Sequence, residues 1–261
     1  KDSCRKCKAL ITACPAHRYT HGMHHTLQQT IADNLARVRD SIANAAHRAG
    51  RRPETVRLVA VSKTQPAEAV AAAVAAGQRV FGENTVQDAF TKIPHFAGEP
   101  LEWHFIGHLQ SNKVKFIPGN FSWVHSLDSL KLAERLSRMA EEKQVVISTL
   151  IEVNISRDPA KHGVDPDAVP PLMDELLRES LPGLALRGLM AIGPQDGTET
   201  ELRAAFAALR RLRDSVATQH ALPAFTELSM GMSGDYVEAI AEGATLVRIG
   251  SAIFGDRSRR R

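Results

Sequence analysis

The feature that most constrains the fold is a regular alternation of short apolar runs and helical stretches between residues 56 and 250. Each apolar run has the length and composition of a strand buried on both faces. No two runs are joined by a hairpin signal, so the strands must be parallel. Eight such repeats predict one α/β domain, a closed (β/α)8 barrel of the TIM type, rather than an open doubly wound sheet. The predicted strands span residues 56–61, 79–82, 102–106, 123–125, 145–154, 184–191, 226–229 and 245–249.

The predicted helices include one that precedes the first strand. From Thr26 to Ala49 apolar residues recur three and four positions apart, which is typical of an amphipathic helix, and Gly50 ends the pattern. Only a short helix can follow the last strand, so we expect the N-terminal helix to cover that side of the barrel. The other predicted helices span residues 67–76, 109–116, 129–142, 167–179, 200–219 and 236–242, and one more ends near residue 96.

The two ends of the chain differ in charge from its body. Residues 1–22 carry five Lys or Arg against one acid, and residues 257–261 add four arginines. Without residues 1–22 the basic and acidic side chains balance, so the charge lies at the ends rather than on a folded face, which argues against a nucleic-acid binder. We expect a disordered leader (1–22), a barrel domain (23–256) and a basic tail (257–261).

All three cysteines, Cys4, Cys7 and Cys14, lie in the leader. The body therefore has no disulfide framework, which indicates a reducing compartment, and we expect a cytoplasmic protein. His17 and His21 follow the cysteines, but the spacing is too short for the usual zinc finger, so no metal site is predicted. No apolar run approaches the roughly 20 residues of a membrane helix, so no membrane partner is expected.

Lys63 follows the first strand, in the segment Arg57-Leu-Val-Ala-Val-Ser-Lys-Thr64. The carboxyl ends of barrel strands gather on one face, and functional sites are built there. A lysine at such a strand end is either a solvated cap or a functional amine able to form a Schiff base. Lysines are common on exposed surfaces, so this position alone leaves both readings open.

Two turns that combine glycine and serine follow the seventh and eighth strands. Met230-Gly-Met-Ser-Gly234 leads into a helix, so its backbone N–H groups and the Ser233 hydroxyl can hold an anion. Gly250 and Ser251 end the neighbouring strand, where phosphate sites recur in barrels. Either turn alone is more simply a turn glycine with a capping serine, but the two together favour phosphate binding.

Arg248 lies within the eighth strand, and alternation turns it to the opposite side from Val247 and Ile249. An arginine inside a barrel is costly to bury without an anionic or accepting partner. That partner is either an internal carboxylate, for which Glu83 is the candidate, or a ligand. A phosphate site, an amine across the barrel mouth and an arginine between them describe a receptor for pyridoxal 5′-phosphate.

Six blocks of sequence, in order, closely resemble the pyridoxal phosphate homeostasis proteins, which are single-domain relatives of the alanine racemase N-terminal barrel. The resemblance covers residues 26–255 and implies the fold-type III pyridoxal phosphate barrel. The blocks are Ala60-Val-Ser-Lys-Thr64, Phe81-Gly-Glu-Asn84, His104-Phe-Ile-Gly-His-Leu-Gln-Ser-Asn-Lys113, Arg187-Gly-Leu-Met-Ala191, Leu228-Ser-Met-Gly-Met-Ser233 and Val247-Arg-Ile-Gly250.

The resemblance implies that pyridoxal 5′-phosphate is bound as an aldimine of Lys63. It also implies Asn84 near the cofactor, Arg248 at the ring nitrogen, and phosphate contacts from the residues Ser233, Gly250 and Ser251. The family takes part in vitamin B6 homeostasis without established catalytic turnover, so no catalytic residue is assigned. Ser251 stands where threonine is frequent, which keeps the hydroxyl.

Three functions stay open at this point. A homeostasis protein that binds the cofactor without turnover is the first, and pyridoxal phosphate-dependent apoenzymes are its possible recipients. A low-activity amino-acid racemase is the second, but it needs a second base, and the only tyrosines are Tyr19, in the leader, and Tyr236, which reads as a surface or capping residue. A Schiff-base aldolase acting on a phosphorylated sugar is the third. Without a racemase-like second domain, we expect a monomer.

Overall fold

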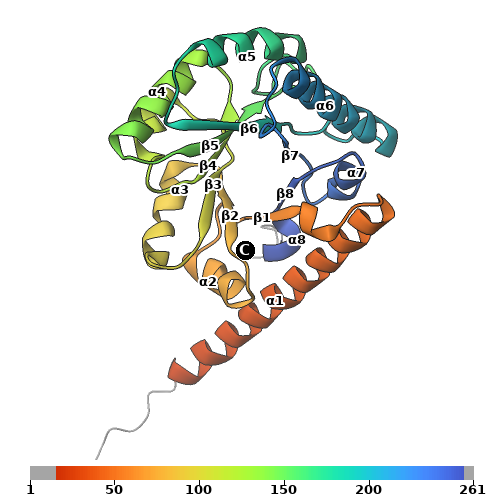
Figure 1. Cartoon of the computed structure of the whole chain (residues 1–261). Helices are drawn as coiled ribbons and strands as arrows, with labels where there is room; N and C mark the ends of the chain where they lie inside the picture. Colours follow the sequence, from red (N-terminus) through yellow and green to blue (C-terminus); the bar gives the residue numbers. More distant parts are fainter. Residues whose placement is uncertain (1–15, 256–261) are drawn as a thin grey trace, which may run out of the picture.

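The structure is a computed structural model that describes residues 16–255, with side chains described from residue 27 onward. Eight parallel strands pair in sequence order, and β8 pairs with β1 to close the barrel (Figure 1). The predicted (β/α)8 barrel is confirmed. The strands are β1 (Arg57–Val61), β2 (Val80–Glu83), β3 (Glu102–Phe105), β4 (Trp123–Leu127), β5 (Ile147–Glu152), β6 (Leu184–Met190), β7 (Glu227–Ser229) and β8 (Leu246–Ile249).

Helices follow the strands and form the outer layer (Figure 1). The α-helices are α1 (Ala16–Arg48), α2 (Ala67–Ala75), α3 (Val86–Phe90), α4 (Leu130–Glu142), α5 (Val169–Arg178), α6 (Glu199–Gln219), α7 (Tyr236–Ala241) and α8 (Ser251–Phe254). Within residues 16–255 there are also four short 3-10 helices: η1 (Pro53–Thr55), η2 (Ile93–Phe96), η3 (Ser111–Phe116) and η4 (Pro166–Ala168). None of the helices in the described part of the chain is long and apolar enough to cross a membrane.

Local sequence signals explain several helix ends. Thr198 and Glu201 form a capping box that begins α6, because each side chain accepts a hydrogen bond from the other residue's backbone N–H. The segment predicted as a helix over residues 109–116 is instead the 3-10 helix η3, because Pro118 and Gly119 leave it too short to propagate α-helical turns. The predicted strand over 145–154 is shorter at both ends in β5.

The helix α1 lies across the place where the first and last strands meet. It packs against α2, α7 and α8, as expected from the short eighth helix (Figure 1). Its buried stripe includes Ile31, Leu35 and Val38, and Asn34 Nδ2 donates a hydrogen bond to the Ile253 carbonyl at 2.8 Å. The helix begins at Ala16 rather than at the predicted Thr26. Residues 1–15 and 256–261 lie outside the described residues, and so do the side chains of the cysteine-containing leader.

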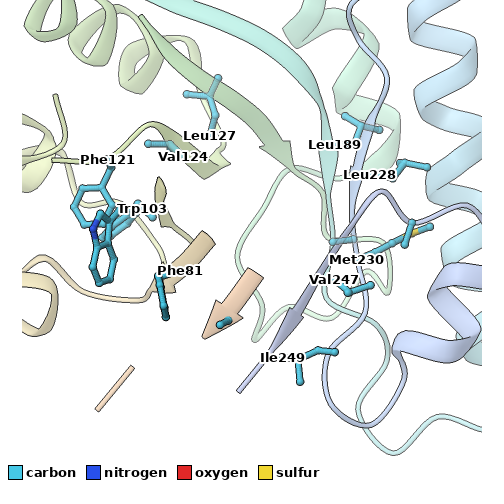
Figure 2. Packing of buried hydrophobic residues seen from close by; sticks show 14 of the residues in the cluster. Phe81, Trp103, Phe121, Val124, Leu127, Leu189, Leu228, Met230, Val247 and Ile249 are labelled. Carbon is cyan, nitrogen blue, oxygen red and sulfur yellow. The ribbon is translucent and has the colours of Figure 1, made fainter. Parts of the chain in front are cut away.

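The core has two parts that follow the alternation of the strands. Most buried apolar side chains lie between the barrel and the helices, and Figure 2 shows Val247 and Ile249 on the same side of β8 within this layer. A smaller cluster, which contains Val59, Trp123, Leu150, Met190 and Leu246, fills the barrel interior. Arg248, between Val247 and Ile249, therefore faces the interior, as the alternation predicted.

Candidate functional site

A cavity of about 430 Å³ opens at the carboxyl ends of the strands. All six residues that the sequence singles out line it: Lys63, Asn84, Ser233, Arg248, Gly250 and Ser251. Apolar side chains form much of the remaining wall: Val61, Ile106, Met190, Ile192 and Met232. The size and the mixture of an apolar wall with a few polar groups are those of a small-molecule site.

Lys63 and Asn84 follow adjacent strands, β1 and β2. The Lys63 side chain is exposed, although the preceding Ser62 is fully buried, and Thr64 on its other side has a left-handed backbone with a φ of 60°. The Asn84 backbone lies against Gly107, where a Cβ atom would come 2.1 Å from the Asn84 carbonyl oxygen. Only glycine fits at residue 107, so this contact fixes where Asn84 leaves the end of β2.

The two turns after β7 and β8 present free backbone donors to the cavity. The amide groups of Ser233, Gly234 and Ser251 donate to no backbone carbonyl among the described residues. The side chains of Ser233 and Ser251 add two hydroxyl groups on the same cavity wall. Free N–H groups with hydroxyls beside them are a suitable arrangement for an anion such as a phosphate.

Asp235, which the sequence analysis did not single out, holds the first turn in shape. Its buried carboxylate accepts a hydrogen bond from the Met232 amide, and the Met232 carbonyl accepts from the Asp235 and Tyr236 amides. These bonds use the Met232, Asp235 and Tyr236 amides and leave those of Ser233 and Gly234 available. The sequence could have indicated this role, because Asp235 stands directly before a predicted helix and after a Gly-Met-Ser-Gly turn.

Arg248 forms the floor of the cavity from inside the barrel and is only 5% exposed. Its Nη1 donates to Ser229 Oγ at 2.6 Å, and its Nη2 donates to the Ala191 carbonyl at 3.0 Å. Burial lowers the pKa of Arg248 to about 10, partly offset by Asp235 and Glu152, so the guanidinium stays protonated at neutral pH. The described residues accept two of its five N–H bonds, and a ligand in the cavity can accept others.

Two buried histidines continue from Arg248 through the barrel interior. His125 Nδ1 lies 2.9 Å from Ser229 Oγ, and His125 Nε2 lies 2.8 Å from His104 Nδ1. His104 Nε2 lies 2.7 Å from Glu102 Oε1, on the far side of the barrel from the cavity. The histidine chain, as we call Arg248, Ser229, His125, His104 and Glu102, is thus continuous through the core.

The two ends of the histidine chain determine the direction of every hydrogen bond in it. Glu102 can only accept, because the hydrogen bond from His104 and the charge of Arg57 lower the pKa of Glu102 to about 2. Burial lowers the pKa of both histidines, so each is neutral and carries one proton. His104 and His125 must therefore both be protonated at Nε2, and Ser229 donates to His125 while it accepts from Arg248.

Two buried carboxyl groups lie near the site, Glu83, which the sequence analysis named, and Glu152, which it did not. Burial raises the pKa of Glu152, at the end of β5, to about 7, and its Oε2 has no partner among the described residues. Burial also raises the pKa of Glu83 to about 7, against the effect of its hydrogen bonds from Lys92 and Ser62. The suggested ion pair between Arg248 and Glu83 is wrong, because Glu83 pairs with Lys92 at 2.7 Å.

Three further polar residues, Tyr236, Lys113 and Lys161, lie away from the cavity wall. Tyr236 begins α7, and its hydroxyl donates to Ser41 Oγ in α1 at 2.8 Å, so this half-buried residue connects two helices. Lys113 lies in η3. Lys161, in the loop after β5, donates to the Gly193 carbonyl at 2.9 Å.

Comparison with known proteins agrees with this architecture. Residues 33–258 match the family model described as the alanine racemase N-terminal domain. A protein of Pseudomonas aeruginosa named pyridoxal phosphate homeostasis protein is 47% identical over 228 residues, which cover 87% of this chain and 96% of that protein. The Escherichia coli protein of the same name is 46% identical over 233 residues, with 87% and 97% coverage.

Solved structures also resemble this barrel. The structure of PipY from Synechococcus elongatus with pyridoxal phosphate bound is 40% identical, with a TM-score of 0.76 and coverage of 86% of this chain and 100% of that chain. An alanine racemase of Clostridium difficile has a TM-score of 0.67 at 14% identity, and 58% of that chain is covered, so this likeness shows the fold alone. The chain belongs to the pyridoxal phosphate homeostasis proteins, a family built on the alanine racemase N-terminal domain.

Proposed function

We propose that this protein binds pyridoxal 5′-phosphate in the cavity at the strand ends and takes part in keeping the cell's pool of this cofactor balanced. The observation that carries the proposal is that an exposed lysine, a buried arginine and two turns with free N–H donors line one cavity. The names of the relatives and the cofactor bound in the PipY structure support it. Recipients of the cofactor would be apoenzymes that depend on it.

The residues present fit the cofactor's chemical groups. Ser233, Gly250 and Ser251 offer hydroxyl and backbone donors to a dianionic phosphate. Lys63, after the neighbouring strand β1, offers a primary amine on the cavity wall and would condense with the cofactor's aldehyde, forming a carbon–nitrogen double bond and releasing one water molecule. Asn84 follows the adjacent strand β2 and also lines the cavity, and Arg248 on the floor would face the ring.

Arg248 favours binding of the cofactor without efficient catalytic turnover. The cofactor's ring acts as an electron sink for carbanion chemistry when its nitrogen is protonated. A guanidinium that remains charged and donates a hydrogen bond to that nitrogen keeps the proton off it. Racemisation would also need a base on the second face of the substrate, and Tyr236 is engaged with Ser41 instead.

The direct test is the absorption spectrum of the purified protein during titration with pyridoxal 5′-phosphate. We expect a band near the violet edge of the visible spectrum that is absent in Lys63→Ala and unchanged in Lys113→Ala, since Lys113 does not line the cavity. A wild-type protein that stays colourless would refute binding. Steady-state racemisation of an amino-acid panel separates the alternatives, because robust turnover that is lost in Lys63→Ala would establish an enzyme instead.

A further inference from the structure

Lys92 is a fully buried lysine that lies behind the strand ends, outside the cavity. Its Nζ donates to the Ser62 carbonyl at 2.7 Å and to Glu83 Oε1 at 2.7 Å, and it lies 3.1 Å from Asp88 Oδ1. Three acceptors match the three N–H bonds of an ammonium group. A lysine with no exposed surface is rare unless it is paired in this way.

The partners of Lys92 hold the two residues that flank Lys63. Ser62 donates its hydroxyl to Glu83 Oε1 at 2.6 Å and presents its carbonyl to Lys92. Thr64 donates its backbone N–H to Asp88 Oδ2. The peptide groups before and after the Lys63 Cα atom are therefore both bound to one buried cluster, which fixes the direction in which the Lys63 side chain leaves the backbone.

Thr64 shows that this part of the backbone is held rather than relaxed. Its φ of 60° lies in the left-handed region, which is unfavourable for a β-branched residue. Such a conformation persists only where surrounding contacts impose it, and these positions concentrate at functional sites. The hydrogen bond from Thr64 to Asp88 is the contact that does so here.

Stability alone does not account for the cluster. Replacing a buried ion pair by apolar side chains is often neutral or stabilising, since desolvation offsets the attraction. The cluster also keeps Glu83 Oε2 buried without a partner among the described residues. The cluster costs desolvation energy and lies directly behind Lys63, so its effect on the direction of the Lys63 side chain explains it better than stability does.

We propose that Lys92, together with Glu83 and Asp88, is a positioning residue for Lys63. By binding both flanking peptide groups, the cluster aims the Lys63 amine into the cavity before any ligand arrives. Less conformational freedom is then lost when the amine meets an aldehyde. The expected gain in cofactor affinity rests on the proposed function, whereas the expected ordering of the backbone around Lys63 does not.

The test uses Asp88, because Lys92→Met leaves Glu83 buried without a cation and endangers the whole fold. In the cofactor-free protein, Asp88→Ala should speed hydrogen exchange of the Thr64 amide by roughly ten- to hundred-fold. Asp88→Asn keeps an accepting oxygen and should restore most of the protection. With the cofactor, Asp88→Ala should weaken binding by roughly ten-fold or more, again with recovery in Asp88→Asn.

Ser137→Ala is the control for a general loss of stability, since Ser137 Oγ accepts from the Gly183 amide at 3.1 Å in a distant part of the fold. It should lower the melting temperature without changing Thr64 exchange or cofactor affinity. The inference is overturned if Asp88→Ala leaves the exchange rate of the Thr64 amide unchanged. It is also overturned if Asp88→Ala and Ser137→Ala weaken cofactor binding to the same extent for the same fall in melting temperature. If the wild type binds no cofactor, the proposed function fails, and Thr64 exchange alone decides about the cluster.

Discussion

Replacing Ser229 by alanine interrupts the histidine chain at its connection to Arg248. The Ser229 hydroxyl accepts from the guanidinium at 2.6 Å and lies 2.9 Å from His125 Nδ1, and all three side chains are buried. A hydrogen bond to a charged group contributes about 1.5–3 kcal/mol, and an acceptor left unpaired in the core costs about 1–3 kcal/mol. We expect Ser229→Ala to lower the free energy of unfolding by about 3–5 kcal/mol, a large part of the usual total of about 5–15 kcal/mol.

Ser126 provides a matched control, because it is equally buried and its Oγ has no hydrogen-bond partner among the described residues. Ser126→Ala removes an unsatisfied polar group and should leave stability unchanged or raise it by up to about 1–3 kcal/mol. Urea unfolding of the cofactor-free proteins, followed by circular dichroism, measures both. If both variants lose the same free energy of unfolding, or if Ser229→Ala is as stable as the wild type, the histidine chain does not stabilise the fold.

Three further predictions follow from the structure. At pH 7, nitrogen-15 NMR should find His104 and His125 neutral and protonated at Nε2, and a proton on either Nδ1 would contradict the deduced direction of the chain. Burial raises the pKa of Glu152 from 4.5 to about 7, so the native state loses about 3 kcal/mol as pH rises through that window, and Glu152→Gln should abolish this part of the pH dependence in unfolding measurements. Gly107→Ala places a Cβ atom 2.1 Å from a backbone oxygen and should weaken cofactor binding, whereas Gly50→Ala, outside the cavity and with nothing within 4 Å of the added Cβ atom, should not; equal titration curves for the two variants would refute the contact.

The barrel and the membership of the cavity were predictable because both follow from periodic patterns. Short apolar runs separated by helices imply parallel strands, and parallel strands in a barrel bring their carboxyl ends together. Lys63 and Arg248 could therefore be assigned to one face from their positions alone. The start of α1 was missed because residues 16–25 carry no apolar repeat that would predict a helix.

The polar network could not be predicted, because its partners are far apart in the chain. His125 and Ser229 are separated by 104 positions, and nothing near either residue indicates that they meet. Lys92 follows a helical segment and reads as an ordinary surface lysine, although its side chain is fully buried. Glu152 ends an apolar strand, where a solvated carboxylate is the usual expectation. The partners and the burial of these side chains depend on which strands become neighbours in the closed barrel.

The position of α1 has a consequence for how the chain folds during synthesis. This helix is made before α7 and α8, two of the helices that it packs against. Until then part of its apolar stripe, including Ile31 and Leu35, has no final partner, and β1 cannot pair with β8. Contacts between the ends of a chain form slowly, and exposed apolar surface favours aggregation while they are missing. The apolar stripe of α1 is therefore exposed to aggregation until α7 and α8 have been made, and closure of the barrel is the event that buries it.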